Sequence, residues 1–116
     1  MRAIELARLV YEKCKEYFDN GRLYAKRIKE IAREALGEAE VYVFGSILRG
    51  EAHPMLSDVD ILIVSRNAPS DNDERARIMA RIKREIGELN PFEIHMATPR
   101  EYEWYKRFID RIEVIE

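Results

Sequence analysis

The sequence predicts a mixed α/β (α+β) fold in which helices flank a small central sheet of three or four strands. Apolar residues recur at helical spacing in four segments, and three shorter segments are β-branched, aromatic or alternating in polarity. The chain has 116 residues, of which 47% are hydrophobic, enough for one compact core. We therefore expect a single domain over residues 1–116.

The first helix is predicted over residues 2–18, before a stop signal at residues 19–21. Its apolar stripe includes Cys14, so we expect a buried, inert thiol there. A second helix is predicted over residues 22–36, with Gly37 as its C-cap. Both helices should pack against the sheet, with their alternating charges in solvent rather than on nucleic acid. The stripe of the first helix comprises Ala3, Leu6, Ala7, Val10, Cys14, Tyr17 and Phe18.

Two strands are predicted near the middle of the chain. Residues 41–44 are β-branched or aromatic, and residues 59–64 are almost continuously apolar, which suits a strand buried on both faces. Asp58 and Asp60 stand at the start of this second strand. Because side chains alternate along a strand, the two carboxylates project from the same face, about 6.5–7 Å apart along the backbone. Such a pair indicates a site for one divalent cation or for two.

Gly45 and Ser46 end the first of these strands. Glycine permits a tight turn and a close approach by a ligand, and serine offers a hydroxyl and an N–H to a phosphate oxygen. Arg49 is the only Lys or Arg of the following loop; it either reaches a phosphate or lies on the plain surface, and we keep it as a candidate nucleotide-binding residue. His53 precedes Pro54, and we favour a solvated histidine over a metal or substrate contact.

A turn-rich connector, residues 66–72, leads to a third helix predicted over residues 73–89. The arginines of this helix, Arg75 among them, are expected in solvent. The core stripe of the helix comprises Ile78, Ile82, Ile86 and Leu89.

A third strand is predicted over residues 91–97, with Glu93 and His95 on its polar face. A capping box with proline at the first helical position then starts a fourth helix at residues 98–101. We expect its aromatic side chains in the core or in a subunit interface rather than under a nucleotide base. The sequence does not decide whether residues 113–116 form a short edge strand. The stripe of the fourth helix is Tyr102, Tyr105, Ile109 and Ile112, with Trp104 and Phe108 beside it.

The central motif has a counterpart in a known family. Gly45-Ser46, then eleven residues, then Asp58-Val59-Asp60 between apolar strands resembles the signature of the nucleotidyltransferase superfamily that includes DNA polymerase β. The resemblance extends from about residue 41 to residue 96. The small size of the chain is similar to that of the minimal nucleotidyltransferase (MNT) branch, whose members often act as antitoxins in HEPN–MNT toxin–antitoxin pairs.

The resemblance implies the nucleotidyltransferase fold and nucleotidyl transfer as the activity. Gly45 and Ser46 would hold the β- and γ-phosphates of a nucleoside triphosphate, for which we expect ATP. Asp58, Asp60 and Glu93 would hold Mg²⁺, as two ions about 3.5–4 Å apart. An acceptor hydroxyl would attack the α-phosphorus, and pyrophosphate would leave. For an antitoxin, the acceptor would be a hydroxyl of its toxin.

Glu93 is assigned to the site because it is the only acidic residue inside a strand candidate after Asp60. The superfamily uses a third acidic residue on a further strand, and Glu93 can face the same cations if its strand lies beside that of Asp60. We favour this role over a glutamate that faces solvent at a sheet edge. His95 is either a partner of Glu93 or a partly exposed side chain.

Composition excludes several classes of protein. The formal net charge of −2 gives no general attraction to nucleic acid, and no apolar run reaches the roughly 20 residues of a membrane span. The charged N-terminal segment lacks the apolar centre of a signal peptide, so we expect a cytoplasmic protein. Cys14 is the single cysteine, which excludes a disulfide within the chain.

The sequence alone leaves two classes of function open. The chain is either a nucleotidyltransferase enzyme or a binding module. The binding module would be a non-catalytic antitoxin, or a nucleotide- or metal-binding domain that acts by protein contact. The chain has little room for a second domain that would grip the base and the acceptor. We therefore expect a HEPN-type toxin or a second copy of the chain to complete the site.

Overall fold

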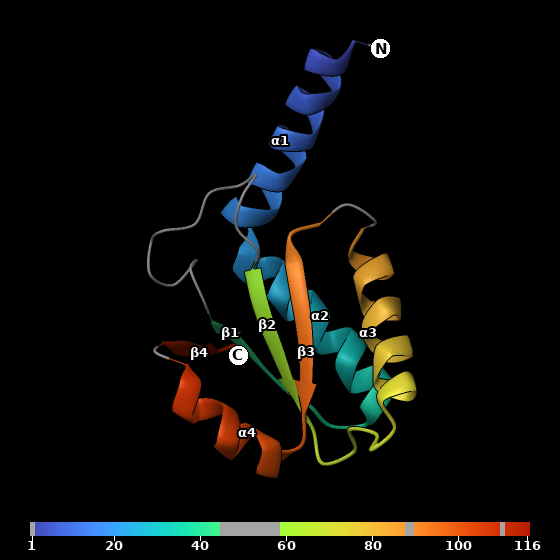
Figure 1. Ribbon diagram of the computed structural model, residues 1–116, viewed down its shortest axis with the longest axis vertical. Helices are drawn as coiled ribbons and strands as arrows, with labels where there is room; N and C mark the ends of the chain where they lie inside the picture. Colours follow the sequence, from blue (N-terminus) through green and yellow to red (C-terminus); the bar gives the residue numbers. More distant parts are fainter. Residues whose placement is uncertain (1, 45–58, 88–89, 110) are drawn as a thin grey trace.

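The computed structural model describes residues 2–44, 59–87, 90–109 and 111–116. Their strands form one sheet, which the helices flank (Figure 1). The mixed α+β class predicted from the sequence is confirmed. In chain order the elements are α1 (Ala3–Asp19), α2 (Gly21–Leu36), β1 (Glu40–Phe44), β2 (Val59–Val64), α3 (Asn72–Ile86), β3 (Phe92–Ala97), α4 (Pro99–Tyr105), the 3₁₀ helix η1 (Lys106–Phe108) and β4 (Ile112–Val114).

The strands form a mixed sheet in the order β3-β2-β1-β4. β1 pairs antiparallel with β2 on one side and with β4 on the other, whereas β2 pairs parallel with β3. The parallel pair is joined through α3, which supplies the crossover that parallel neighbours require. β4 lies at one edge of the sheet, near residues 113–116, for which the sequence did not decide whether a strand forms.

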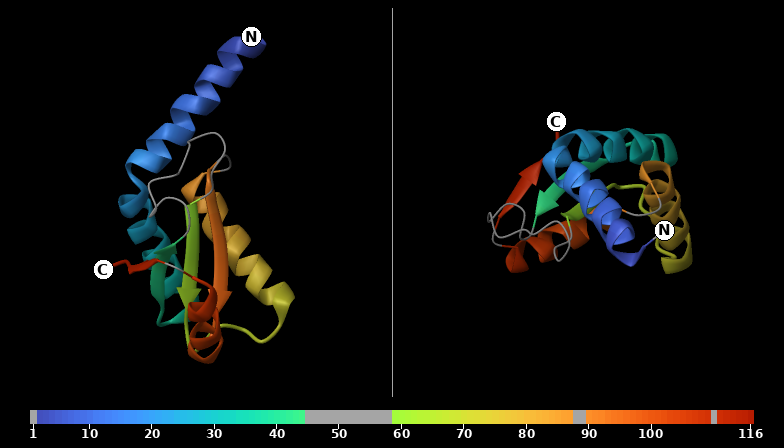
Figure 2. Two further views of the ribbon diagram at one scale, coloured as in Figure 1. Left: turned by 60° about the vertical axis from the view of Figure 1, so that its left-hand side comes forward. Right: turned by 90° about the horizontal axis from the view of Figure 1, so that it is seen from above.

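The larger core lies between the sheet and the helices α2 and α3, which cover the same face (Figure 2). Val59, Ile61 and Ile63 of β2 belong to it, because alternate residues of a strand point to the same side. Ile28 of α2 and Ile82 of α3, the latter from the stripe predicted for the third helix, are fully buried against them.

A smaller core lies on the opposite face, beneath α4. Leu62 and Val64 of β2 are buried there, so β2 is covered on both faces, as its continuous apolar run predicted. Tyr42 stacks on Tyr102 of α4 with ring centroids 4.7 Å apart. α4 begins two residues after β3 ends, and its Tyr102 and Tyr105 pack on this smaller core at the carboxyl ends of β2 and β3.

α1 does not pack along the sheet as expected. Figure 1 shows its N-terminal half extending beyond the sheet, and only its C-terminal end joins the core. There Tyr17 is buried and meets Phe92 edge-on, with ring centroids 5.7 Å apart. Cys14 is half-buried, not buried. An amphipathic pattern identifies the apolar face of a helix but not whether other elements cover it. The exposed residues of the predicted stripe are Ala3, Leu6 and Ala7, and Val10 is half-buried.

The C-terminal segment also differs from the prediction. The capping box at Thr98 forms, but the helix gives way to η1, and Ile112 lies in β4, paired with Phe44. Trp104 and Phe108 are exposed, so they are not part of the core. Among the described residues, no helix combines the length and the apolar character needed to cross a membrane.

The predicted exposure of Arg75 is also wrong. The side chain was expected in solvent, yet it is only 13% exposed and binds Glu101 at the start of α4, with Nη2 2.8 Å from Oε1.

Candidate functional site

Two neighbouring strands bring the polar residues of the candidate site together. β2 and β3 run side by side in the middle of Figure 1, and Asp60 is the register partner of Glu93. His95 lies two residues further along β3, opposite Leu62, so it shares a face with Glu93. The predicted third strand therefore does lie beside the strand of Asp60, which was the condition for the two carboxylates to meet.

The three side chains converge on a small volume. Nε2 of His95 lies 3.7 Å from Oδ1 of Asp60 and 3.6 Å from Oε1 of Glu93. One ligand atom from each residue lies within 4.8 Å of the other two. The side chain of Asp60 is 24% exposed and that of Glu93 is 53% exposed. The cluster thus stands at the rim of the smaller core, with Glu93 on its solvent side.

Regular structure holds the cluster in place. Six consecutive residue pairs join β2 to β3, so the backbone positions of Asp60, Glu93 and His95 depend on a continuous ladder. Phe44, the last residue of β1, is the register partner of Asp60 on the other side. Its ring centroid lies 5.7 Å from that of His95, at an interplanar angle of 45°. Groups on paired strands are placed more accurately than groups on loops.

This donor set fits a divalent cation. Carboxylate oxygens are common ligands of Mg²⁺ and Mn²⁺, and an imidazole nitrogen adds affinity for other divalent metals. The two carboxylates repel each other at this separation, and a bound cation would offset that repulsion. Asp60, Glu93 and His95 are the described residues that could hold such an ion.

The structure places only part of the predicted site. It brings Asp60 and Glu93 together and turns Nε2 of His95 toward both. Phe44, which the sequence analysis treated only as a strand residue, is also a neighbour of the site. Its position directly before the Gly45-Ser46 motif could have indicated this. Outside the described residues lie the predicted Gly45, Ser46, Arg49 and Asp58, together with His53.

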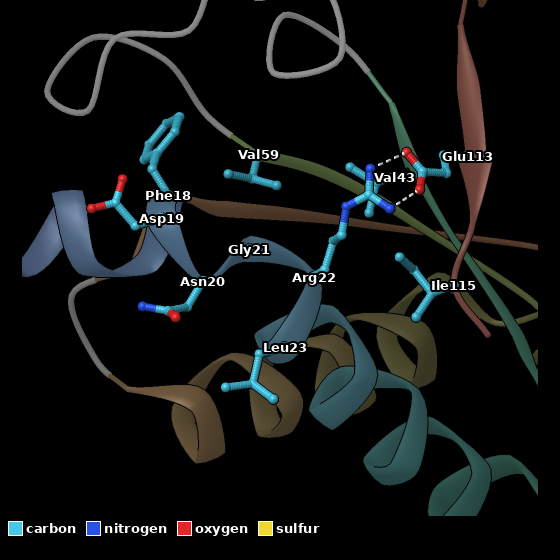
Figure 3. A pocket seen from close by; sticks show the side chains of 10 residues that line it. All are labelled: Phe18, Asp19, Asn20, Gly21, Arg22, Leu23, Val43, Val59, Glu113 and Ile115. Atoms are coloured by element: carbon cyan, nitrogen blue, oxygen red, sulfur yellow. Dashed lines mark hydrogen bonds and ion pairs between the residues drawn. The ribbon is translucent and has the colours of Figure 1, made fainter.

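A separate cavity of about 410 Å³ lies on the helix-covered face of the sheet (Figure 3). Val43 and Val59 line it, and they alternate with Phe44 and Asp60 along their strands, so they point away from the candidate site. Arg22 forms a two-point ion pair with Glu113 in its wall, as the dashed lines of Figure 3 show. The cavity is therefore distinct from the carboxylate cluster.

Known proteins resemble this chain in sequence and in fold. The model of the nucleotidyltransferase domain family matches residues 25–115. The crystal structure of a candidate nucleotidyltransferase is 33% identical, with a TM-score of 0.63 over 78% of this chain and 96% of that chain. A candidate nucleotidyltransferase from Sulfolobus solfataricus is 24% identical, with a TM-score of 0.57 over 87% of this chain and 84% of that chain, and shows the fold alone. No curated protein matches the chain.

Proposed function

Since this chain belongs to the nucleotidyltransferase domain family, we propose that it transfers a nucleoside monophosphate from ATP to a hydroxyl of an acceptor, with Mg²⁺ as cofactor. The observation that carries the proposal is the register pairing of Asp60 with Glu93, which gathers two carboxylates and an imidazole at one place. Phosphoryl transfer at a metal site needs such carboxylates beside the reacting oxygens.

Each candidate residue has a proposed role. Asp60 and Glu93, with Asp58 from the sequence motif, would hold Mg²⁺ as one or two ions. Bound Mg²⁺ would supply positive charge against the triphosphate and favour loss of the acceptor proton. The roles of Gly45, Ser46 and Arg49 rest on the sequence alone: their backbone N–H groups, hydroxyl and guanidinium are the donors proposed for the phosphate oxygens.

The proposed reaction is an in-line displacement. The acceptor oxygen forms a bond to the α-phosphorus while the bond to the α–β bridging oxygen breaks, and pyrophosphate leaves with that electron pair. The half-exposed carboxylate of Glu93 is the group proposed to receive the hydroxyl proton, because it is the more exposed of the two carboxylates. The more buried Asp60 would act as a ligand of the cation.

The acceptor is proposed to be a partner protein, a HEPN-type toxin, with a second copy of the chain as the other candidate partner. Large apolar side chains exposed on three elements support a protein contact. They are Ile4, Leu6, Leu9 and Tyr11 on α1, and Trp104 and Phe108 at α4 and η1.

Incubation of the full chain with ATP labelled at the α-phosphate, Mg²⁺ and the product of the adjacent reading frame tests the proposal. We expect label on the partner and release of pyrophosphate, and a loss of at least about 100-fold in rate for Asp60→Asn and for Glu93→Gln. Glu103→Gln, which changes an exposed carboxylate of α4, is the matched control and should keep the wild-type rate. Label transfer that survives in Asp60→Asn would show that the site is wrong.

A non-catalytic antitoxin, or a nucleotide- or metal-binding module that acts by contact, is the second candidate function. The exposed apolar residues of α1 favour it, since a surface that binds a partner needs no chemistry. Full neutralisation of the toxin by Asp60→Asn, together with no label transfer by the wild type, would favour contact over catalysis.

A further inference from the structure

The candidate metal site contains the imidazole of His95, although the proposed reaction needs only carboxylates there. His95 lies on β3 and presents Nε2 to the oxygens of Asp60 and Glu93 at 3.7 Å and 3.6 Å. These separations are longer than a normal N–H···O hydrogen bond, about 2.7–3.2 Å. Two ligands in neighbouring octahedral positions, each about 2.1 Å from an ion, lie about 3 Å apart. Small rotations of the side chains would therefore bring all three ligand atoms onto one cation.

The histidine is held in this direction by its surroundings. The ring of Phe44 lies against that of His95 on the neighbouring part of the face. The side chain of His95 is 32% exposed, so most of it is buried, and its Nε2 lies near both carboxylates. Histidine nitrogen and carboxylate oxygen occur together as ligands in sites for transition metals.

We propose that Asp60, Glu93 and His95 together hold one divalent transition-metal ion, of the class of Co²⁺, Ni²⁺ and Zn²⁺, more tightly than Mg²⁺. Imidazole nitrogen is a favoured ligand of these ions, whereas Mg²⁺ takes oxygen ligands and keeps several waters. The inference rests on the proposed function only in assigning a cation to these carboxylates. It adds the third ligand and the class of metal.

Titration of the metal-free full chain with Co²⁺ tests the inference without nucleotide or acceptor. Bound Co²⁺ absorbs visible light according to its ligands, and calorimetry gives its affinity and the competing affinity of Mg²⁺. We expect one Co²⁺ per chain at this site and only weak displacement by Mg²⁺. His95→Gln should lower the affinity for Co²⁺ by at least about tenfold, since even the loss of an outer partner of a metal ligand costs about 10–100-fold.

Two further variants separate ligation from a merely structural effect. His95→Asp replaces nitrogen by oxygen and should move the selectivity toward Mg²⁺ while a cation still binds, which a packing role would not do. His53→Gln removes the other histidine of the chain and is the matched control, with the Co²⁺ affinity and spectrum of the wild type expected.

The inference is overturned if His95→Gln keeps the affinity for Co²⁺, if His95→Asp keeps the wild-type preference for Co²⁺ over Mg²⁺, or if His53→Gln loses as much affinity as His95→Gln. These results leave the proposed reaction untouched if label transfer in Mg²⁺ still depends on Asp60. Conversely, a chain that binds Co²⁺ through His95 but transfers no label keeps the metal site and loses the proposed function.

Discussion

At the scale of single residues, the Arg75 side chain ties three parts of the chain together. Its guanidinium donates to the carbonyl of Pro69, to that of Met96 at 3.3 Å, and to the carboxylate of Glu101. Glu101 also accepts the N–H of Thr98 at 2.9 Å in the capping box. The hydrogen bond from Arg75, followed by that from the Thr98 backbone, lowers the pKa of Glu101 below its usual value.

Replacing Glu101 by Gln should lower the free energy of unfolding by about 1 kcal/mol or less at pH 7, because solvent screens this partly exposed pair. The folded-state pKa lies below the unfolded value, about 4.3, so the charged form contributes stability above that pH. This contribution is lost as the pH falls through the folded-state pKa. The difference between wild type and Glu101→Gln in urea unfolding should therefore shrink between pH 7 and pH 3.

Glu103→Gln is the matched control on the same helix, because Glu103 pairs with Lys106 at an exposed position. We expect a change of a few tenths of a kcal/mol at most for this variant. An equal loss for Glu101→Gln at both pH values would contradict the assigned role of its charge.

At the scale of elements, α1 and α2 have similar amphipathic patterns but are buried to different extents. α2 is anchored on both sides: Ile28 is buried in the core, and Nζ of Lys29 donates to the Ile115 carbonyl just after β4 at 2.6 Å. α1 has its Tyr17 in the core, but its N-terminal half leaves Ile4 78% exposed. The stability of α1 over that half depends on local hydrogen bonds and exposed ion pairs such as that of Arg8 with Glu12.

The substitution of isoleucine by alanine distinguishes the two helices. Ile28→Ala should lower the free energy of unfolding by about 2–5 kcal/mol, because it leaves a cavity in the core. Ile4→Ala should change it by less than about 0.5 kcal/mol, because the side chain is already in water. Chemical unfolding at several protein concentrations measures both. A large, concentration-dependent loss for Ile4→Ala would show that another molecule covers α1.

At the scale of the whole molecule, the sheet separates two environments. Helices α2 and α3 cover one face of the sheet and α4 packs on the other (Figures 1 and 2), on which Asp60, Glu93 and His95 are partly exposed. Carboxylates gathered at the end of a buried strand carry mutual repulsion, which the folding of the rest of the sheet must offset.

A divalent cation should therefore stabilise the whole fold. Mg²⁺ or Mn²⁺ binds the native arrangement and not the unfolded chain, so a concentration of 100 times Kd would add about 2.7 kcal/mol and raise Tm by several degrees. Asp58→Asn and Asp60→Asn should leave the metal-free protein as stable or more stable, and should remove the gain. Thermal melts with a chelator and with millimolar Mg²⁺ measure both effects.

Glu12→Gln, at an exposed carboxylate of α1, is the control and should keep the full gain. Absence of a metal-dependent shift in the wild type, or a full shift in both aspartate variants, would remove these aspartates from the metal site.

The local pattern by itself determined most elements of this protein. Helical spacing placed α1, α2 and α3 to within three residues at each end, alternation placed β3, and the capping box marked the start of α4. The spacing of the Gly-Ser turn and the paired aspartates indicated the family. The apolar run of residues 59–64 placed Asp60 at the start of a strand, and alternation placed Glu93 on the polar face of another, because these features depend on residues that are neighbours along the chain.

Only the tertiary structure decided how these elements meet. The order β3-β2-β1-β4, the pairing of Asp60 with Glu93 and the direction of His95 depend on contacts between residues far apart in the sequence. The same holds for the burial of Arg75 and for the exposed half of α1. A periodic pattern defines which face of an element is apolar, but the free energy of that face depends on what covers it, and that is a property of the assembled fold.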